Sequence, residues 1–75
     1  MEEKIKMLLK DVNEDILTYD GNAMLEEGII DSFDVIDIMT RLEEEFDMEI
    51  DAEYAVAENF ANMDAIIAMM KKVMK

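Results

Sequence analysis

The 75-residue chain contains no cysteine, no histidine and no proline, and it has only two glycines. Without cysteine there is no disulfide framework and no thiol nucleophile. Without histidine the commonest general base and metal ligand are missing. No glycine-rich phosphate-binding loop is present either. We therefore expect a protein that is not an enzyme, with no catalytic residues and no dedicated metal site, in which little interrupts helix formation.

Long hydrophobic runs are also lacking. The longest runs from Ala65 to Met70, whereas a membrane-spanning helix needs about 20 apolar residues. The first residues, Met1 to Lys4, lack the apolar stretch of a signal peptide. These features predict a cytoplasmic monomer without membrane insertion, and the length predicts a single domain over residues 1–75.

Basic residues are scarce, and the net charge is −13. Between Asp11 and Met70 there are eighteen acidic residues and one basic residue, Arg41; every lysine lies in 4–10 or 71–75. Such a charge repels nucleic acid and attracts basic protein surfaces. Because 52% of the residues are hydrophobic, the chain does not have the composition of a disordered acidic tail. We expect a folded protein with basic protein partners and no nucleic-acid partner.

The hydrophobic pattern begins with a helix. Four apolar residues of the first segment share one helical face: Ile5, Leu8, Leu9 and Val12. The connection 13–31 follows, and we expect Leu17 and Leu25 to anchor it to the core. Nineteen residues is long for a structureless loop, so a functional role or a short extra turn of helix is indicated.

A second helix is predicted to begin at Ser32. Its expected buried stripe is Val35, Ile38, Met39, Leu42 and Phe46. Phe33, Ile36 and Thr40 fall on a flanking face. Residues 46–50 alternate in polarity without a strand to pair with, which indicates an extended connection.

The third and last helices complete the prediction. Residues 51–58 are compatible with a short third helix, and Asn62 is the expected N-cap of the last helix. The expected inward face of that helix is Met63, Ile66, Ile67, Met70, Val73 and Met74. The fold class is thus an all-α small four-helix bundle, with three longer helices, one short helix and a long first loop.

One apparent calcium site fails on inspection. Asp11, Asn13 and Asp15 occupy positions 1, 3 and 5 of an EF-hand loop. The glycine required at position 6 is Ile16, and the glutamate required at position 12 is Asn22. The geometry of an EF-hand depends on both positions, so we do not interpret this segment as one.

The segment Asp31-Ser32-Phe33 joins the long loop to the acidic second helix. Its plain interpretation is a helix cap, in which Ser32 accepts hydrogen bonds from first-turn amides and Asp34 complements the helix dipole. The segment also resembles the Asp-Ser-Leu motif of acyl carrier proteins. The resemblance extends over nearly the whole chain, including the long loop, the helix end 42–47, Ile50, and the segment 58–62 before the last helix.

The resemblance implies a cofactor. In this family a phosphopantetheinyl transferase uses coenzyme A and Mg²⁺ to attach 4′-phosphopantetheine to the serine hydroxyl, which here is Ser32. Asp31 would lie close to the metal and phosphates of the transferase. The arm carries acyl or aminoacyl groups as thioesters, so the expected partners include a loading ligase and acyl-processing enzymes with basic surfaces, such as those of fatty acid biosynthesis.

The same helix is expected to bind these partners. Its acidic side chains Asp34, Asp37, Glu43 and Glu44 would attract basic surfaces. Phe33, Ile36 and Thr40 would supply the apolar contact beside the arm. An ordinary solvated helix face usually mixes lysines among its acids, and this segment has almost none.

The cargo and one alternative stay open. Between Gly28 and Asp31 the chain has one residue more than is typical of fatty-acid carriers, a spacing that resembles D-alanyl and other aminoacyl carriers. The tryptophan common late in D-alanyl carriers is absent. The spacing favours a small or aminoacyl cargo over a long acyl chain. The alternative function is an unmodified acidic helical module for protein interaction.

Overall fold

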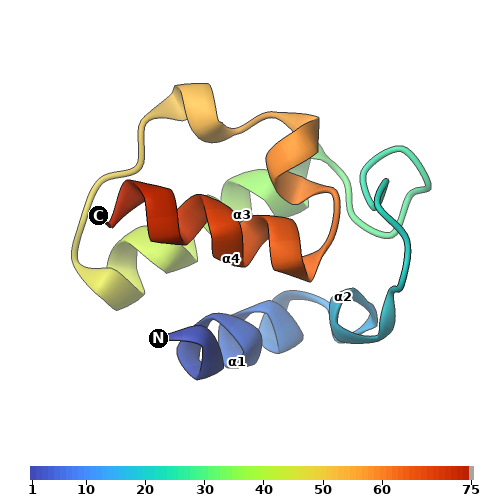
Figure 1. Ribbon diagram of the computed structural model, residues 1–75, viewed down its shortest axis with the longest axis horizontal. Helices are drawn as coiled ribbons and strands as arrows, with labels where there is room; N and C mark the ends of the chain where they lie inside the picture. Colours follow the sequence, from blue (N-terminus) through green and yellow to red (C-terminus); the bar gives the residue numbers. More distant parts are fainter. Residues whose placement is uncertain (75) are drawn as a thin grey trace.

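The computed structural model describes residues 1–74, which contain helices and no strand (Figure 1). The four α-helices are α1 (Glu2–Val12), α2 (Asp15–Thr18), α3 (Ser32–Phe46) and α4 (Met63–Val73). Two short 3₁₀ helices, η1 (Ala52–Tyr54) and η2 (Ala57–Phe60), lie between α3 and α4. The predicted small all-α bundle, with three longer helices, a short one and a long first loop, is confirmed.

The helices surround one core. α1 packs against both α3 and α4, and η2 packs against α4. In Figure 1, α4 crosses in front of α3, and the N-terminus lies on the same side as the end of α4. There Lys71 Nζ lies 3.3 Å from Glu2 Oε2, in an exposed ion pair that contributes little to stability.

Apolar side chains alone fill this core, and no polar or charged side chain of the described residues is buried. Each of the three longer helices contributes residues with no exposed surface: Ile5 and Leu9 from α1, Ile38 and Leu42 from α3, and Ile66 and Met70 from α4. Met24, Met39 and Met69 are also buried. Because methionine side chains are unbranched and flexible, this core can adapt its packing easily.

The predicted second helix, α3, ends at Phe46. Asp47 adopts the left-handed conformation with φ 49°, and the Met48 amide bonds the Glu43 carbonyl at 3.0 Å. This arrangement closes a helix C-terminus and turns the chain away. The following residues up to Asp51 are irregular, as the prediction of an extended connection requires. Phe46, expected in the buried stripe, is only half-buried because it lies in the last turn.

The long loop is anchored by more residues than predicted. Leu17 and Leu25 pack against the core as expected but are only half-buried, whereas Ile16, Met24 and Ile30 are buried. The short helix α2 turns Ile16 toward the core. The sequence did not single out Ile16 and Met24, because helical periodicity does not show which apolar residues of an irregular loop are buried.

The predicted short helix over 51–58 is also wrong in detail. Two 3₁₀ turns replace it, and neither Ala52 nor Tyr54 is fully buried. Residues 51–58 have no apolar stripe that a continuous helix could bury. The buried side chain in this part of the chain is Phe60, which follows them. The short α-helix of the bundle is α2, inside the long first connection.

The last helix follows its prediction closely. The Asn62 side chain accepts a hydrogen bond from the Ala65 amide at 2.8 Å, so Asn62 is the N-cap. Ile66, Ile67 and Met70 are buried. Met69 joins them, whereas Met74 lies beyond the end of the helix and is 42% exposed.

The corrected loop anchors give a direct test. Replacing Ile16 by alanine should lower the free energy of unfolding by roughly 2–5 kcal/mol, because it leaves a cavity in the core. Leu17→Ala removes a half-buried side chain of equal size and should cost clearly less. Urea unfolding followed by circular dichroism measures both. A larger loss for Leu17→Ala would contradict the observed orientation of α2.

Candidate functional site

The start of α3 is fixed by two aspartates that bond each other's backbone. Asp31 Oδ1 accepts from the Asp34 amide at 2.9 Å, and Asp34 Oδ2 accepts from the Asp31 amide at 3.1 Å. This reciprocal pair is a capping box, with Asp31 as N-cap. The interpretation of Ser32 as the helix cap is therefore wrong, because Asp31 performs that role.

Ser32 is instead the first residue of α3, and it is exposed. Its hydroxyl makes no hydrogen bond with any side chain or backbone group of residues 1–74. The positive end of the helix dipole lies beside it, where negative charge is stabilised. The result is an accessible hydroxyl on a well-fixed backbone, between the positive end of the helix dipole and the carboxylates of the capping box.

An apolar ridge, which we define as Phe33, Ile36 and Thr40, runs along the exposed side of α3. Phe33 is 79% exposed and Ile36 is 63% exposed, the highest values among the large hydrophobic residues apart from Met7. The spacing of three and four residues places the ridge side chains on one helix face. Exposed apolar side chains gathered in this way are typical of a protein contact surface.

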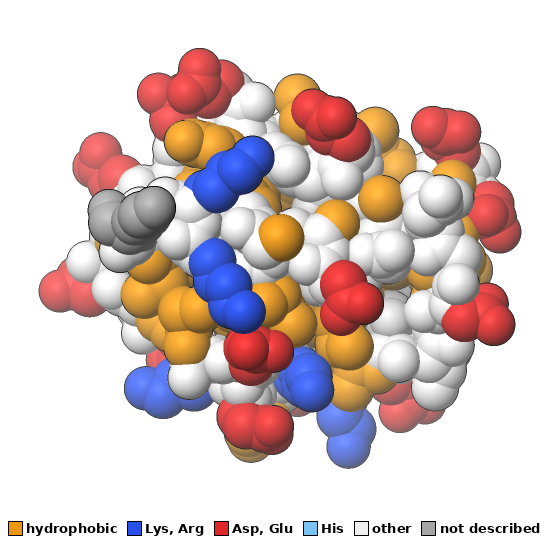
Figure 2. Space-filling view, in the orientation of Figure 1, with side chains coloured by type: hydrophobic (Ala, Val, Ile, Leu, Met, Phe, Trp, Pro, Cys, Tyr) orange, Lys and Arg blue, Asp and Glu red, His pale blue; other side chains and the backbone are white. Residues whose placement is uncertain are grey.

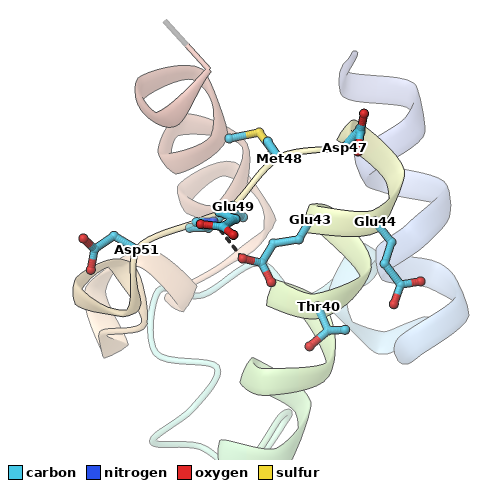
Figure 3. Close-up of a pocket in the computed structure, with 8 residues that line it drawn as sticks. Thr40, Glu43, Glu44, Asp47, Met48, Glu49 and Asp51 are labelled. Atoms are coloured by element: carbon cyan, nitrogen blue, oxygen red, sulfur yellow. Dashed lines mark hydrogen bonds between the residues drawn. The ribbon is translucent and has the colours of Figure 1, made fainter.

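Three of the four acidic residues predicted to bind partners also have partners inside the chain. Asp34 belongs to the capping box. Asp37 Oδ1 accepts from Arg41 Nε at 3.0 Å. Glu43 Oε2 accepts from the Ile50 amide at 2.8 Å and so holds the segment after α3 (Figure 3). Glu44 projects from α3 in a different direction and is exposed, which makes it the most available to a partner of the four predicted acids.

An open acidic hollow of about 790 Å³ lies at the end of α3 (Figure 3). Its lining residues are Thr40, Glu43, Glu44, Asp47, Met48, Glu49, Ile50 and Asp51. Sequence reasoning missed Asp47, Glu49 and Asp51 here, although the predicted extended connection after the helix was a signal that they would gather beside it. Within residues 1–74, no group of three or more acidic side chains is arranged to hold a metal ion.

The predicted site residues therefore form one continuous surface rather than one pocket. All of them lie on α3 or at its cap. At 1.5 Å per residue, Glu44 lies roughly 18 Å along the helix axis from Ser32. The acids at the end of α3 thus cannot contact a phosphate bound directly to Ser32, but they can contact a protein that covers the helix.

Tyr19 holds the long loop together, although the sequence did not single it out. Its hydroxyl donates to Glu27 Oε2 at 2.7 Å and accepts from the Ala23 amide at 2.9 Å. Partial burial, and then the bond to Glu27, raise the pKa of the Tyr19 phenol above its ordinary value of 10.0. The phenol therefore stays a neutral donor at physiological pH. A side chain at Gly21 would collide with the Tyr19 ring, because an added Cβ would lie 2.6 Å from Cζ.

Charges are unevenly distributed over the surface. Figure 2 shows basic side chains gathered over α1 and α4, with acidic side chains among them and around the margin of the same face. No helix within residues 1–74 has both the length and the apolar character needed to cross a bilayer. Neither a protein-family model nor a solved structure matches this chain.

The capping arrangement predicts two different mutational effects. Asp31→Ala should lower the free energy of unfolding by about 1 kcal/mol, because the Asp34 amide loses its acceptor. Ser32→Ala should leave stability nearly unchanged, since the Ser32 hydroxyl takes no part in the cap. Chemical unfolding of both variants is the measurement. A loss at Ser32→Ala equal to that at Asp31→Ala would show that the serine caps the helix after all.

Proposed function

We propose that this protein is a carrier that holds acyl or aminoacyl groups on a 4′-phosphopantetheine arm attached to Ser32 and delivers them to partner enzymes. The observation that carries the proposal is the exposed Ser32 hydroxyl, which the Asp31 cap leaves free at the first residue of α3. The Asp31-Ser32-Phe33 motif and its resemblance to acyl carrier proteins support the same function.

The residues around Ser32 suit a phosphodiester. The N-terminal end of α3 stabilises the negative charge of a phosphate. Asp31 uses Oδ1 in the cap, and its Oδ2 makes no hydrogen bond with residues 1–74. This second oxygen is available to orient the Mg²⁺ of a transferase. When bound, the arm supplies the thiol that the chain lacks and on which cargo is held as a thioester.

Attachment requires only a nucleophilic hydroxyl from this chain. Ser32 Oγ forms a bond to the pantetheine-side phosphorus of coenzyme A, and the bond from that phosphorus to the bridging oxygen breaks. 3′,5′-Adenosine diphosphate leaves with the bonding electrons. The hydroxyl proton passes to a base of the transferase, since this chain has no histidine and no base bonded to Ser32.

Partner enzymes would dock on α3. The apolar ridge supplies contact area next to Ser32, and the acidic residues along the helix steer basic surfaces toward it. Glu44 is exposed and has no counter-charge among the ion pairs of residues 1–74, whereas Arg41 partly offsets the charge of Asp37. For the cargo we favour a small acyl or aminoacyl group, on the spacing from Gly28 to Asp31.

Attachment is tested by intact mass. With coenzyme A, Mg²⁺ and a broad-specificity phosphopantetheinyl transferase, the wild type should gain one phosphopantetheinyl mass. Ser32→Ala should gain none, while keeping its fold by circular dichroism. If several transferases leave the wild type unmodified, the carrier function fails and the unmodified interaction module becomes the better proposal.

Partner docking is tested by reversing one charge. Glu44→Lys should lower kcat/KM for phosphopantetheinylation several-fold, and added salt should lower the wild-type value too, because exposed charges are screened over about 8–10 Å. Glu3→Lys, an equal charge reversal on α1, serves as the matched control and should have a smaller effect. Equal effects of both reversals would assign the attraction to net charge alone.

A further inference from the structure

Asn13 lies at the junction of α1 and α2 and bonds two separate parts of the chain. Its Oδ1 accepts from the Asp15 amide at 3.0 Å, which fixes the turn into α2. Its Nδ2 donates to the Ile29 carbonyl at 3.0 Å, across sixteen residues of sequence. Both bonds are short enough to be well formed. The Asn13 side chain thus joins the turn into α2 to the end of the long loop.

The backbone that Asn13 holds leads directly into Ser32. The Ile29 and Ile30 amides both donate to the Met24 carbonyl, at 2.9 and 3.4 Å. Ile30 is 1% exposed, and Asp31, the cap of α3, comes next. The Ile29 carbonyl accepts a hydrogen bond from the Asn13 side chain, and the Ile29 amide donates one to the Met24 carbonyl. Both backbone groups of Ile29 are therefore fixed just before the helix.

We propose that Asn13 is a positioning residue for the attachment reaction at Ser32, an inference that rests on the proposed function. Asn13 does not touch Ser32. It acts through the Ile29 carbonyl, which restrains Ile30 and the Asp31 cap and so keeps the Ser32 backbone in one position for attack of its hydroxyl on phosphorus. The docking surface lies further along α3, so Asn13 affects the chemical step and not the encounter.

The backbone before Ser32 needs a restraint because it follows a glycine. Gly28, with φ 79°, lies directly before this segment, and the chain reverses there without a side chain to hold it. A glycine in such a turn leaves the adjoining backbone with more freedom than other residues would. The side-chain amide of Asn13 is the only side-chain donor of residues 1–74 that bonds the backbone between Gly28 and Ser32.

The test replaces the side-chain NH2 group of Asn13 by an oxygen. Asn13→Asp keeps an oxygen for the Asp15 amide but places a second oxygen, not a donor, against the Ile29 carbonyl. In phosphopantetheinylation of the full chain, kcat should fall about tenfold with KM unchanged, as expected when a reacting group loses its orientation. Hydrogen exchange at the Ile29 and Ile30 amides should accelerate in the unmodified protein.

Asn59→Asp is the matched control. It adds the same charge and removes a similar bond, from Asn59 Nδ2 to the Tyr54 carbonyl at 2.9 Å, away from the loop. Its kcat should equal that of the wild type. An equal fall in kcat in both variants, or an unchanged kcat in Asn13→Asp, overturns the positioning role while the carrier function stands. A wild type that no transferase modifies overturns the proposed function itself.

Discussion

The reciprocal hydrogen bonds between Asp31 and Asp34 decide where α3 begins, and the rest of the surface depends on that start. The capping box fixes the first turn of the helix, and the apolar spacing along the helix then decides which side chains face the core and which face solvent. Val35 and Ile38 turn inward, and Phe33 and Ile36 turn outward. Ser32, the residue after the cap, is left exposed, and its hydroxyl makes no hydrogen bond within residues 1–74.

The long loop is ordered by a few specific bonds and not by regular structure. Tyr19 closes its middle, Asn62 Nδ2 donates to the Gly21 carbonyl at 3.0 Å, and the Met24 amide donates to the Ala61 carbonyl at 3.1 Å. Asn62 thereby caps α4 and holds the loop with the same side chain. Such bonds join segments far apart in sequence, so the loop and the last helix are expected to lose order together.

The sequence was sufficient where periodicity and capping act locally. The faces of α1, α3 and α4 follow from apolar spacing, and Asn62 is recognisable as a cap from its position before an apolar run. Local sequence patterns did not predict contacts that depend on residues distant in the sequence. Leu17 and Leu25 were expected to anchor the loop and do pack against the core, but nothing in their neighbourhood shows that Ile16 and Met24 are buried more deeply.

The candidate site divides in the same way. Ser32, the apolar ridge and Glu44 could be predicted because they belong to one helix with a clear pattern. Two facts could not be read from the sequence: that Asp31 and not Ser32 is the cap, and that Glu43 is bonded to the Ile50 amide. Each depends on the geometry of a turn. The hydrogen bond from Asn13 to the Ile29 carbonyl spans sixteen residues, and no sequence motif predicts it.

The two ends of the described chain lie on one side of the molecule, and the loop that leads into α3 lies on the other (Figure 1). A host protein could therefore receive this bundle at a surface turn, with short linkers at both ends and little distortion of either partner. Inserted in that way, the bundle would keep the helix with Ser32 directed away from its host. The other end of α3 runs back toward the side of the termini (Figure 1), and Glu44 lines a hollow together with Lys4 of α1, so a host would lie closer to the acidic end of the helix than to its start.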